Sequence, residues 1–421
     1  MLDFPASPTP GQIFTAPNGT QWTWDSVKWT SGANVGGYLP LAGGTMSGDI
    51  VLAHDPPAAL NPATKQYVDA QNIRYKNRII NGDMAVDQRH GGATSTPAVS
   101  AYAIDRWELF VTVGSKGNVG QIAALSGLFP YTSCLSWGTA AAYAVTASDY
   151  FFFVQTIEGV NFNDTQWGYG SAQPVTLEFW ASSTLTGTFG GSIRNGADTR
   201  SYVFTYSLPT ANTWTKVKIN VPGDTAGTWS VAATAKGLDL AFSIGAGATF
   251  QTTAGAWVAG NFLTAPGAVS VVGTLNATLN ITGVALMVGA AAANAEPEFK
   301  KYADNLVDCQ RYYEKSYPQT SAPGAVISSG APYVLFNLPS AIMTNGSANI
   351  QFKATKRSSP TTIVYSPTTG ASGKGRDIAN NAEVVANSVN VGDSGFAVYS
   401  VTSVATAQPN FSWHWTADAD F

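Results

Sequence analysis

Aromatic side chains lie beside polar ones in the stretch NFNDTQWGYG. It places Asn163, Asp164 and Gln166 next to Trp167 and Tyr169. Aromatic rings stack on the apolar faces of sugars, while amide and carboxylate groups hydrogen-bond the sugar hydroxyls. This loop is therefore a candidate glycan contact. Because Trp and Tyr more often fill a β-sandwich core than bind a ligand, a core role is the favoured interpretation of each ring.

Trp137 and a second loop, GASGKGRDIANN, supply the remaining candidates for glycan contact. In this loop Lys374, Arg376 and Asp377 follow several glycines. Neither a strand-GxGxxG-helix context nor a GxxxxGK[ST] motif accompanies the glycines, so a phosphate cradle is not expected. The segment is most simply a hairpin loop.

Carboxylates are scattered along the chain, which argues against hydrolytic chemistry. Glycoside hydrolysis needs two carboxyl groups about 5 to 9.5 Å apart, and the sequence alone does not bring a pair together. Asp83 and Asp87 in NGDMAVDQRH are expected to cap turns or to pair with Arg89 and Arg106 at a sandwich edge. Repeating coils typical of a β-helix depolymerase are not visible. The chain is therefore not expected to be an enzyme.

Metal and cofactor chemistry is not expected either. The three histidines and two cysteines lack metal-ligand spacing such as CxxC or HExxH. His90 lies in a loop and His414 between two tryptophans, and neither has a GxSxG context nearby. Two cysteines are too few for a disulfide framework, and whether Cys134 and Cys309 pair is left open.

Composition narrows the function classes further. Charged residues make up 11% of the 421 residues, against about 25% in an average protein, while aromatic residues reach 12%. This balance suits β-sheets better than helix bundles. A net charge of −4 without a Lys/Arg block argues against nucleic acid as a partner. No run of about 18 apolar residues and no signal-peptide pattern is present, so the chain is expected not to insert into a membrane and to stay in the cytoplasm that makes it.

The positioning elements are β-strands from Asn77 to about Ala295. In VTLEFW, Val175, Leu177 and Phe179 alternate with polar neighbours, and turn residues recur every 8 to 12 positions. This pattern is typical of an antiparallel sandwich or jelly roll. A second β region follows from about Ala322 to Phe421.

Two further patterns place aromatic residues in this part of the chain. A short helix is expected where helical spacing runs through Phe299, Tyr302, Leu306 and Cys309, and it leads into a strand containing Tyr312 and Tyr313. Phe411, Trp413 and Trp415 alternate on one strand face and are expected in a core.

The N-terminal segment carries more aromatic area than a small unit can bury alone. Asn18-Gly19 marks a hairpin turn, and Trp22, Trp24 and Trp29 follow it. After a Gly-rich linker, a short strand near Ile50 precedes a polar helix that begins at Asn61-Pro62. Its apolar positions have coiled-coil spacing for less than two heptads.

This N-terminal region resembles part of a known family. LPLAGGTMSGDIVLA followed by ALNPATKQYVDA closely resembles the stalk motif of tailed-bacteriophage tail fibres, with Ser47 in place of the more usual Thr. FPASPTPGQIFTAPNGTQWTWDSVKW is similar to a small module found ahead of that stalk. NRIINGDMAVDQR, YAIDRWEL and CQRYYEKS resemble signatures of a phage-fibre β-sandwich related to carbohydrate-binding jelly rolls. KRSSPTTIVYSPTTGASG is similar to a C-terminal tip segment of such proteins.

The resemblance implies a homotrimer and a domain order. Residues 1–31 are an N-terminal virion-attachment module, 32–76 a trimerising stalk with a short strand and coiled-coil helix, 77–319 the jelly roll, and 320–421 a β-sandwich-like tip domain. Three copies would pool apolar residues that one chain leaves exposed. The expected trimer contacts are Trp22, Trp24, Trp29, Leu41, Met46, Ile50, Ala63, Tyr67 and Ala70.

The sequence therefore predicts a phage tail-fibre adhesin, made in the host cytoplasm and assembled into the virion. Its expected partners are other tail or baseplate proteins, through the N-terminus, and host surface polysaccharide. Two alternatives stay open: a purely architectural collar, neck or baseplate fibre, and a polysaccharide-cleaving tailspike.

Overall fold

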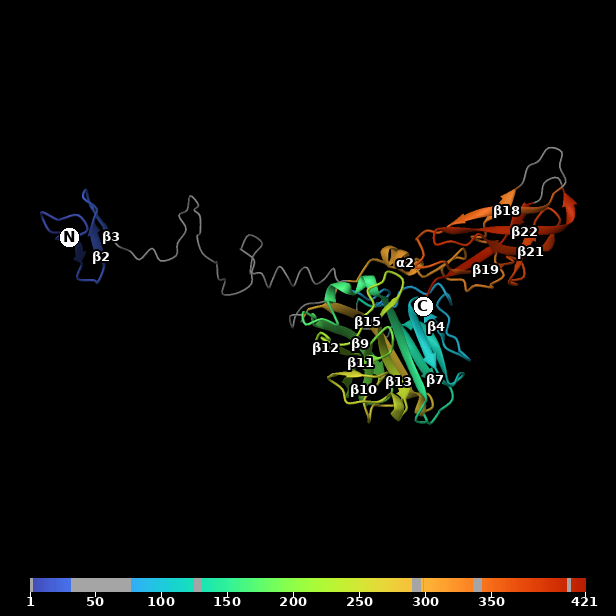
Figure 1. The fold of residues 1–421 in the computed structure, drawn as a ribbon, viewed down its shortest axis with the longest axis horizontal. Coiled ribbons are helices and arrows are strands. Elements are labelled where there is room, and N and C mark those ends of the chain that lie inside the picture. The colour runs from blue at the N-terminus through green and yellow to red at the C-terminus, as the bar shows by residue number, and fades with distance from the viewer. Residues whose placement is uncertain are drawn as a thin grey trace. The chain divides into compact units, whose positions relative to one another are not determined.

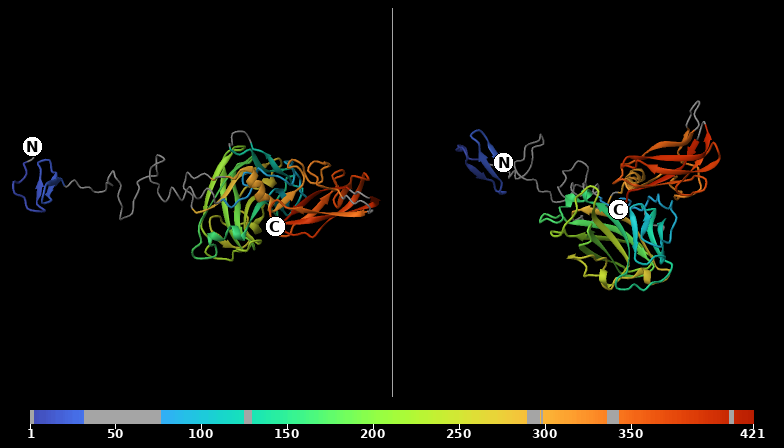
Figure 2. Two further views of the ribbon diagram at one scale, coloured as in Figure 1. Left: turned by 90° about the horizontal axis from the view of Figure 1, so that it is seen from above. Right: turned by 45° about the vertical axis from the view of Figure 1, so that its right-hand side comes forward.

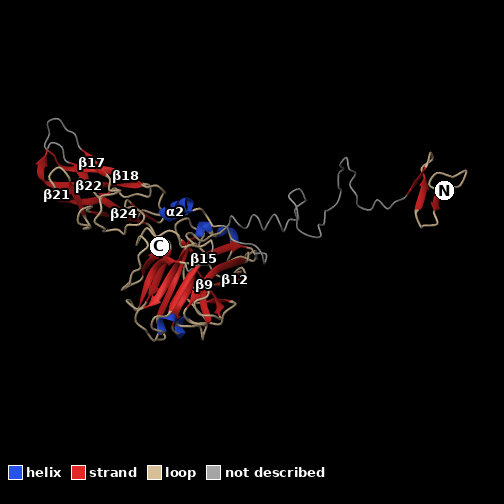
Figure 3. Cartoon of the chain, turned by 180° about the vertical axis from the view of Figure 1, so that it is seen from behind, coloured by secondary structure: helices blue, strands red, loops and turns tan. Residues whose placement is uncertain are grey.

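The computed structural model describes residues 3–31, 77–124, 130–289, 297, 299–335, 343–406 and 410–421. They form two compact units, whose described parts are residues 3–31 and the residues from Asn77 to Phe421. Strands dominate both units (Figure 3). The mainly β fold class is therefore confirmed, while the expected stalk at 32–76 lies outside the described residues.

Aromatic packing holds the first unit together. Its antiparallel sheet has the order β1-β2-β3, with β1 at Ile13–Thr15, β2 at Gln21–Trp24 and β3 at Trp29–Ser31. The ring centroid of Trp29 lies 5.6 Å from that of Trp24 and 5.2 Å from that of Phe4. All three tryptophans remain half-buried in the single chain.

Two antiparallel sheets build the jelly-roll domain (Figure 1). The seven-stranded sheet has the order β14 (Trp257–Ala259), β11 (Arg200–Leu208), β10 (Gly187–Asn195), β13 (Lys236–Ala246), β8 (Tyr150–Glu158), β5 (Trp107–Val111) and β4 (Ala101–Ile104). The five-stranded sheet has the order β12 (Thr215–Val221), β9 (Val175–Ser183), β15 (Thr278–Val288), β7 (Ser133–Thr139) and β6 (Gly117–Ala123). Short 3-10 helices interrupt the connections: η1 (Gly159–Asn161), η2 (Asn163–Thr165), η3 (Ala248–Phe250) and η4 (Val271–Gly273).

Alternation along the strands produces the core between these sheets. Val175, Leu177 and Phe179 of β9 are fully buried, as the period-two pattern predicts. Phe242 of β13 packs against them, with its ring centroid 4.9 Å from that of Phe179 and 6.0 Å from that of Trp107. Burial of this many large rings is the main stabilising contribution to the domain.

A C-terminal domain of two further sheets follows the helix α2 (Tyr302–Gln310). Its three-stranded sheet has the order β16 (Tyr313–Lys315), β24 (His414–Asp418) and β19 (Thr361–Tyr365). Its six-stranded sheet has the order β17 (Tyr333–Leu335), β23 (Asn410–Ser412), β20 (Lys374–Asp377), β21 (Ala382–Val389), β22 (Gly395–Thr406) and β18 (Met343–Gln351). Figure 2 shows these strands, from orange to red, as a body distinct from the cyan-to-yellow jelly roll. The expected helix and strand are both present, but the helix begins at Tyr302 rather than Phe299, and the strand includes Tyr313 and not Tyr312. The exact domain boundaries stay a prediction.

One interpretation in this domain is wrong in part. The segment GASGKGRDIANN is not all loop, because Lys374–Asp377 form β20 and pair with β21 and β23. A Cβ at Gly375 would approach the Ala386 Cβ to 3.3 Å, so the glycine permits close strand packing rather than a turn. In contrast, Phe411, Trp413 and Trp415 are buried in the domain core as expected.

Two arginines join the C-terminal residues to the jelly roll. Arg106 follows β4 with a φ of 68°, and its buried guanidinium pairs with Asp420 and lies 3.5 Å from the ring centroid of Tyr312. Arg89 pairs with Asp418 at 2.7 Å and Asp420 at 2.6 Å. The expected pairing of these arginines with Asp83 and Asp87 is therefore wrong.

The capping part of that expectation is confirmed. Asp87 accepts hydrogen bonds from the backbone N–H groups of His90 at 3.0 Å and Gly92 at 2.8 Å. Asp83 accepts from the Asn305 side chain at 2.9 Å. Asp83 also accepts a hydrogen bond from the backbone N–H of Ala85 at 3.4 Å, so both carboxylates stabilise local turns.

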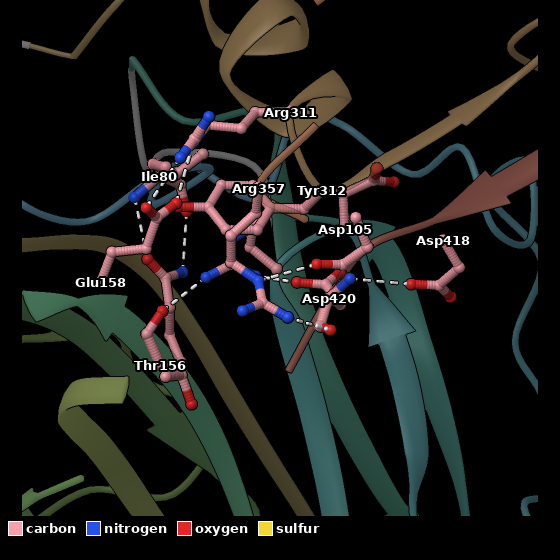
Figure 4. A network of polar contacts seen from close by, with 12 residues as sticks. Ile80, Asp105, Thr156, Glu158, Arg311, Tyr312, Arg357, Asp418 and Asp420 are labelled. Atoms are coloured by element: carbon pink, nitrogen blue, oxygen red, sulfur yellow. Dashed lines mark hydrogen bonds and ion pairs between the residues drawn. The ribbon is translucent and has the colours of Figure 1, made fainter. Parts of the chain in front are cut away.

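A buried acid completes this junction (Figure 4). Glu158 at the end of β8 accepts hydrogen bonds from Arg311 at 2.9 Å and from the Tyr312 hydroxyl at 2.5 Å. Burial alone would raise the pKa of Glu158, but the Arg311 and Tyr312 hydrogen bonds outweigh it and lower that pKa. Glu158 is therefore a structural anchor between the jelly roll and the residues that follow α2.

Candidate binding groove on the seven-stranded sheet

The seven-stranded sheet is aromatic on both of its faces. Four aromatic residues open β8, and successive side chains of a strand point to opposite faces. Phe151 and Phe153 therefore enter the sandwich core, whereas Tyr150 and Phe152 lie on the outer face in a separate apolar cluster. An outer face that needed only to meet water would not carry this set of rings.

Stacked rings form the floor of a groove on this outer face. Phe110 of β5 lies opposite Phe152, with ring centroids 5.3 Å apart and planes only 5° from parallel. The Tyr150 centroid is 5.5 Å from that of Phe152 and 5.2 Å from that of Phe250 in η3. Phe110, Tyr150 and Phe250 are half-buried, so part of each ring is accessible to a ligand.

Charged and amide groups surround the floor. The Arg194 guanidinium lies 5.2 Å from the Phe152 ring centroid and donates to Asp198 at 2.6 Å and to Asn261 at 2.8 Å. Lys236 pairs with Asp239 at 3.0 Å. A hollow of about 100 Å³ is lined by Arg194, Asp198, Lys236 and Asn261, together with the rings and Leu263.

This arrangement has the chemistry of a sugar site. A hollow of this volume is too small for a drug-sized ligand but suits one face of a single sugar ring. The aromatic floor can stack on that face, while Arg194, Asp198 and Asn261 are placed to hydrogen-bond its hydroxyls. Asp198 pairs with Arg194 and has lone pairs left to accept a hydrogen bond from a sugar hydroxyl.

Glu108 extends the same face toward the edge strand. It pairs across the strands with Tyr102 of β4 on one side and with Val154 of β8 on the other, so all three side chains share the outer face. Burial raises the pKa of Glu108 to about 7, against an attraction to Lys236 and Arg89 that lowers it. Below pH 7 this carboxyl can donate a hydrogen bond to a hydroxyl.

Replacing Glu108 by Gln is expected to stabilise the protein at pH 8 but not at pH 5. The folded protein holds the Glu108 proton up to about pH 7, while the unfolded chain releases it near pH 4.5. The stability of the unaltered chain therefore falls as the pH rises through this window. Since the side chain is half-buried, the difference should reach about 1 to 2 kcal/mol. The difference in stability is measured from the urea midpoints of both proteins at pH 5 and pH 8. If both proteins lose the same stability between these pH values, the raised pKa of Glu108 is wrong.

Three of the residues suggested from the sequence are too buried to meet a glycan. Trp137 is 1% exposed, packs on Phe151 and donates to Thr139 at 2.9 Å. Trp167 is 3% exposed within a cluster of rings. Asp377 is fully buried and caps the turn at Asn380. The two tryptophans serve the core, which is the favoured interpretation of such rings, and Asp377 serves a turn.

The other suggested glycan contacts lie on the surface in two separate places. One group lies near η2 and consists of Asn163, Asp164, Gln166 and Tyr169, which are together because they are close in sequence. Asp164 of this group pairs with Arg78. Tyr169 is 68% exposed and makes this group an accessible alternative to the groove. Lys374 and Arg376 are half-buried in β20, where Arg376 donates to Asn381. Asn163, Asp164, Gln166 and Tyr169 thus belong to the jelly roll, and Lys374 and Arg376 to the C-terminal domain.

The expected trimer contacts divide into two sets. Trp22, Trp24 and Trp29 lie half-buried on the sheet of the first unit. The other six lie outside the described residues: Leu41, Met46, Ile50, Ala63, Tyr67 and Ala70. The contact between copies therefore remains a prediction.

The groove residues were not identified from the sequence. YFFF was the available signal, because four successive aromatics in a strand must put rings on both sheet faces. Arg194, Asp198 and Asn261 gave no such signal, since their convergence depends on the pairing of β10 with β13 and on the segment after β14.

The described part of the chain contains no metal-ligand cluster, no disulfide between its two cysteines and no membrane-spanning helix. Its His, Cys, Asp and Glu residues form no group of three or more that could hold a metal ion. Cys134 and Cys309 are both buried and free, so they do not pair. Within the same ranges, none of the helices has the length and hydropathy needed to span a membrane.

Comparisons with known proteins show similarity at the level of solved structures. A scan against protein-family models gives no match, and a search of the curated proteins gives none. The enzymatically active domain of tailspike protein 4 from bacteriophage CBA120 aligns with 51% of this chain and 22% of that one, at 15% identity and a TM-score of 0.28. This chain thus spans about a fifth of the length of that domain.

Carbohydrate-binding modules are also among the similar structures. The family 11 module from Clostridium thermocellum, solved with a mixed-linked tetrasaccharide, aligns with 46% of this chain and 98% of that one, at 13% identity and a TM-score of 0.23. The N-terminal cellulose-binding domain of Cellulomonas fimi β-1,4-glucanase C aligns with 41% of this chain and 89% of that one, at 15% identity and a TM-score of 0.21. Because all three scores are below 0.5, the function of this chain has to be argued from its own residues.

Proposed function

We propose that this protein is a bacteriophage tail-fibre adhesin that binds host surface polysaccharide without cleaving it. It is made in the host cytoplasm, acts as a homotrimer in the virion, and is attached through its N-terminal unit to other tail or baseplate proteins. The groove on the seven-stranded sheet is the glycan site of each copy.

The aromatic floor of the groove is the observation that carries this proposal. Phe110 and Phe152 stack on the outer face of the sheet, and the polar groups of Arg194 and Asn261 lie beside them. Phe152 is buried beneath the half-buried rings of Phe110, Tyr150 and Phe250, so the accessible ring surface lies next to hydrogen-bonding groups, as sugar binding requires. The groove therefore favours the adhesin over an architectural part.

Trimer formation is supported by the N-terminal sequence. Its stalk motif resembles that of trimeric tail fibres, and Trp22, Trp24 and Trp29 keep apolar surface that neighbouring copies could cover. Three linked copies of a weak sugar site raise the avidity by about 10² to 10⁴ over one site. A shallow groove of about 100 Å³ can then serve as an effective attachment site.

Replacing Tyr150 by Ala is expected to weaken polysaccharide binding by roughly threefold to tenfold per site, since one ring contact is lost. The matched control is Tyr169→Ala, which removes an exposed tyrosine from the alternative group near η2 and should leave binding unchanged. Sedimentation velocity of the full chain, alone and with bacterial surface polysaccharides, measures both the oligomer and the binding.

Each outcome of this experiment bears on a different part of the proposal. A trimer that co-sediments with intact polymer supports the adhesin, whereas conversion of the polymer to fragments would identify a depolymerase. A trimer that binds none of the polysaccharides favours the architectural role. If Tyr169→Ala abolishes binding and Tyr150→Ala does not, the site is near η2. A monomer would contradict the stalk interpretation.

A further inference from the structure

A second and larger cavity lies where the C-terminal domain meets the jelly roll. Its volume is about 600 Å³, and it is lined from both domains. Tyr102 and Arg89 come from the jelly roll, while Tyr313, Ile363 and Tyr365 come from β16 and β19. We call it the junction cleft.

The lining of the junction cleft has the same chemistry as the groove. The Arg89 guanidinium lies between two rings, 4.2 Å from the centroid of Tyr102 and 4.0 Å from that of Tyr313. Ile363 is 39% exposed, and Asp418 exposes 38% of its side chain while pairing with Arg89. The Tyr313 ring is buried under Arg89, whereas Tyr102 and Tyr365 are half-buried. These two accessible rings, an aliphatic side chain and a partly accessible carboxylate suit the mixed apolar and hydroxyl surface of a sugar.

The groove and the junction cleft share one continuous face. Phe110 of the groove and Glu108 are two residues apart on β5, so they point the same way. Glu108 lies directly opposite Tyr102, which lines the cleft. The path from Phe110 to Tyr102 thus runs two residues along β5 and across to the neighbouring strand β4. This is a distance on the order of 10 Å.

Electrostatic contacts agree with this placement. The charges of Lys236 on the groove side and Arg89 on the cleft side lower the pKa of Glu108, while those of Asp239 and Asp418 raise it, so Glu108 lies within the electrostatic reach of both sites. The Arg89 and Arg106 pairs with Asp420 fix the two walls of the cleft relative to each other. The cleft is therefore held in place by buried pairs, which favours a binding site that is formed before the ligand arrives.

We propose that the junction cleft is a second subsite for the polysaccharide chain that occupies the groove, with Glu108 between the two. This inference rests on the proposed glycan-binding function. It makes the ligand an internal stretch of a polymer, recognised by the jelly roll and the C-terminal domain together, rather than a single terminal sugar.

Binding should therefore grow tighter as the ligand lengthens beyond what the groove alone can hold. The probes are oligosaccharides of graded length, prepared from a bacterial surface polysaccharide that the full chain retains. Tyr102→Ala and Ile363→Ser should each lose the gain from added length, roughly threefold to tenfold for the longest probes. Both variants should bind the shortest probes as the unaltered chain does.

The control is Val385→Ser, which changes an exposed apolar residue on β21 away from the cleft and should bind every probe normally. Thermal unfolding checks that each variant folds, and Ile363→Ser serves where Tyr102→Ala does not. If affinity does not rise with length, or if the cleft variants keep the gain, the second subsite is wrong while the groove stands. If the full chain retains no polysaccharide, the proposed function itself fails.

Discussion

Replacing Lys356 by Met is expected to lower the free energy of unfolding by about 3 to 5 kcal/mol, because it breaks a buried ion pair. The Lys356 Nζ is inaccessible and donates to Glu314 at 2.6 Å and to the Gln310 carbonyl at 2.6 Å. Glu314 is equally buried on β16. Without the lysine, the donor that the described residues still offer to the Glu314 carboxylate is the backbone N–H of Lys353. Urea denaturation followed by tryptophan fluorescence measures the loss.

A second substitution separates the broken pair from a simple loss of packing. Adding Glu314→Gln to Lys356→Met removes the stranded charge, so the double variant should be more stable than the single one. A single variant that loses less than about 1 kcal/mol would show that the pair contributes little.

This ion pair matters for the proposed ligand as well as for stability. Glu314 is flanked in β16 by Tyr313, whose ring lines the junction cleft. The pair connects this strand to the segment that follows β18 and to the end of α2. A loss of the pair is therefore expected to loosen one wall of the cleft while leaving the groove on the jelly roll in place.

Local patterns in the sequence were sufficient for most of the fold. The alternation in β9 and the helical spacing before Cys309 each correspond to an observed element, because each depends on residues close together in the chain. Burial of Trp413 and Trp415 follows from the same argument. These signals also identify the fold as mainly β, since period-two patterning dominates the sequence.

Long-range pairing was not accessible from the sequence. Arg89 meets Asp418 across 329 residues, so no local rule distinguishes that carboxylate from the nearer Asp87. The binding groove was missed for a similar reason. Alternation shows that Tyr150 and Phe152 lie on one face and Phe151 and Phe153 on the other, but not which face is the core. Only the second sheet decides this.

Replacing Phe242 by Ala is expected to cost about 3 to 5 kcal/mol of unfolding free energy, because the ring is inaccessible and the cavity left behind cannot collapse fully. Its neighbours are the large rings of Trp107, Phe179 and Phe204.

The matched control for this change is Phe250→Ala, which removes the same atoms from the half-buried outer face. Since that ring is partly in water already, its loss should cost less than about 1.5 kcal/mol. Polysaccharide binding, measured under conditions where both variants are folded, should show the reverse order of effects. Phe250→Ala should bind more weakly, and Phe242→Ala should bind normally. Equal stability losses would mean that the outer face is as much a core as the inner one, and the groove would then have no accessible floor for a sugar.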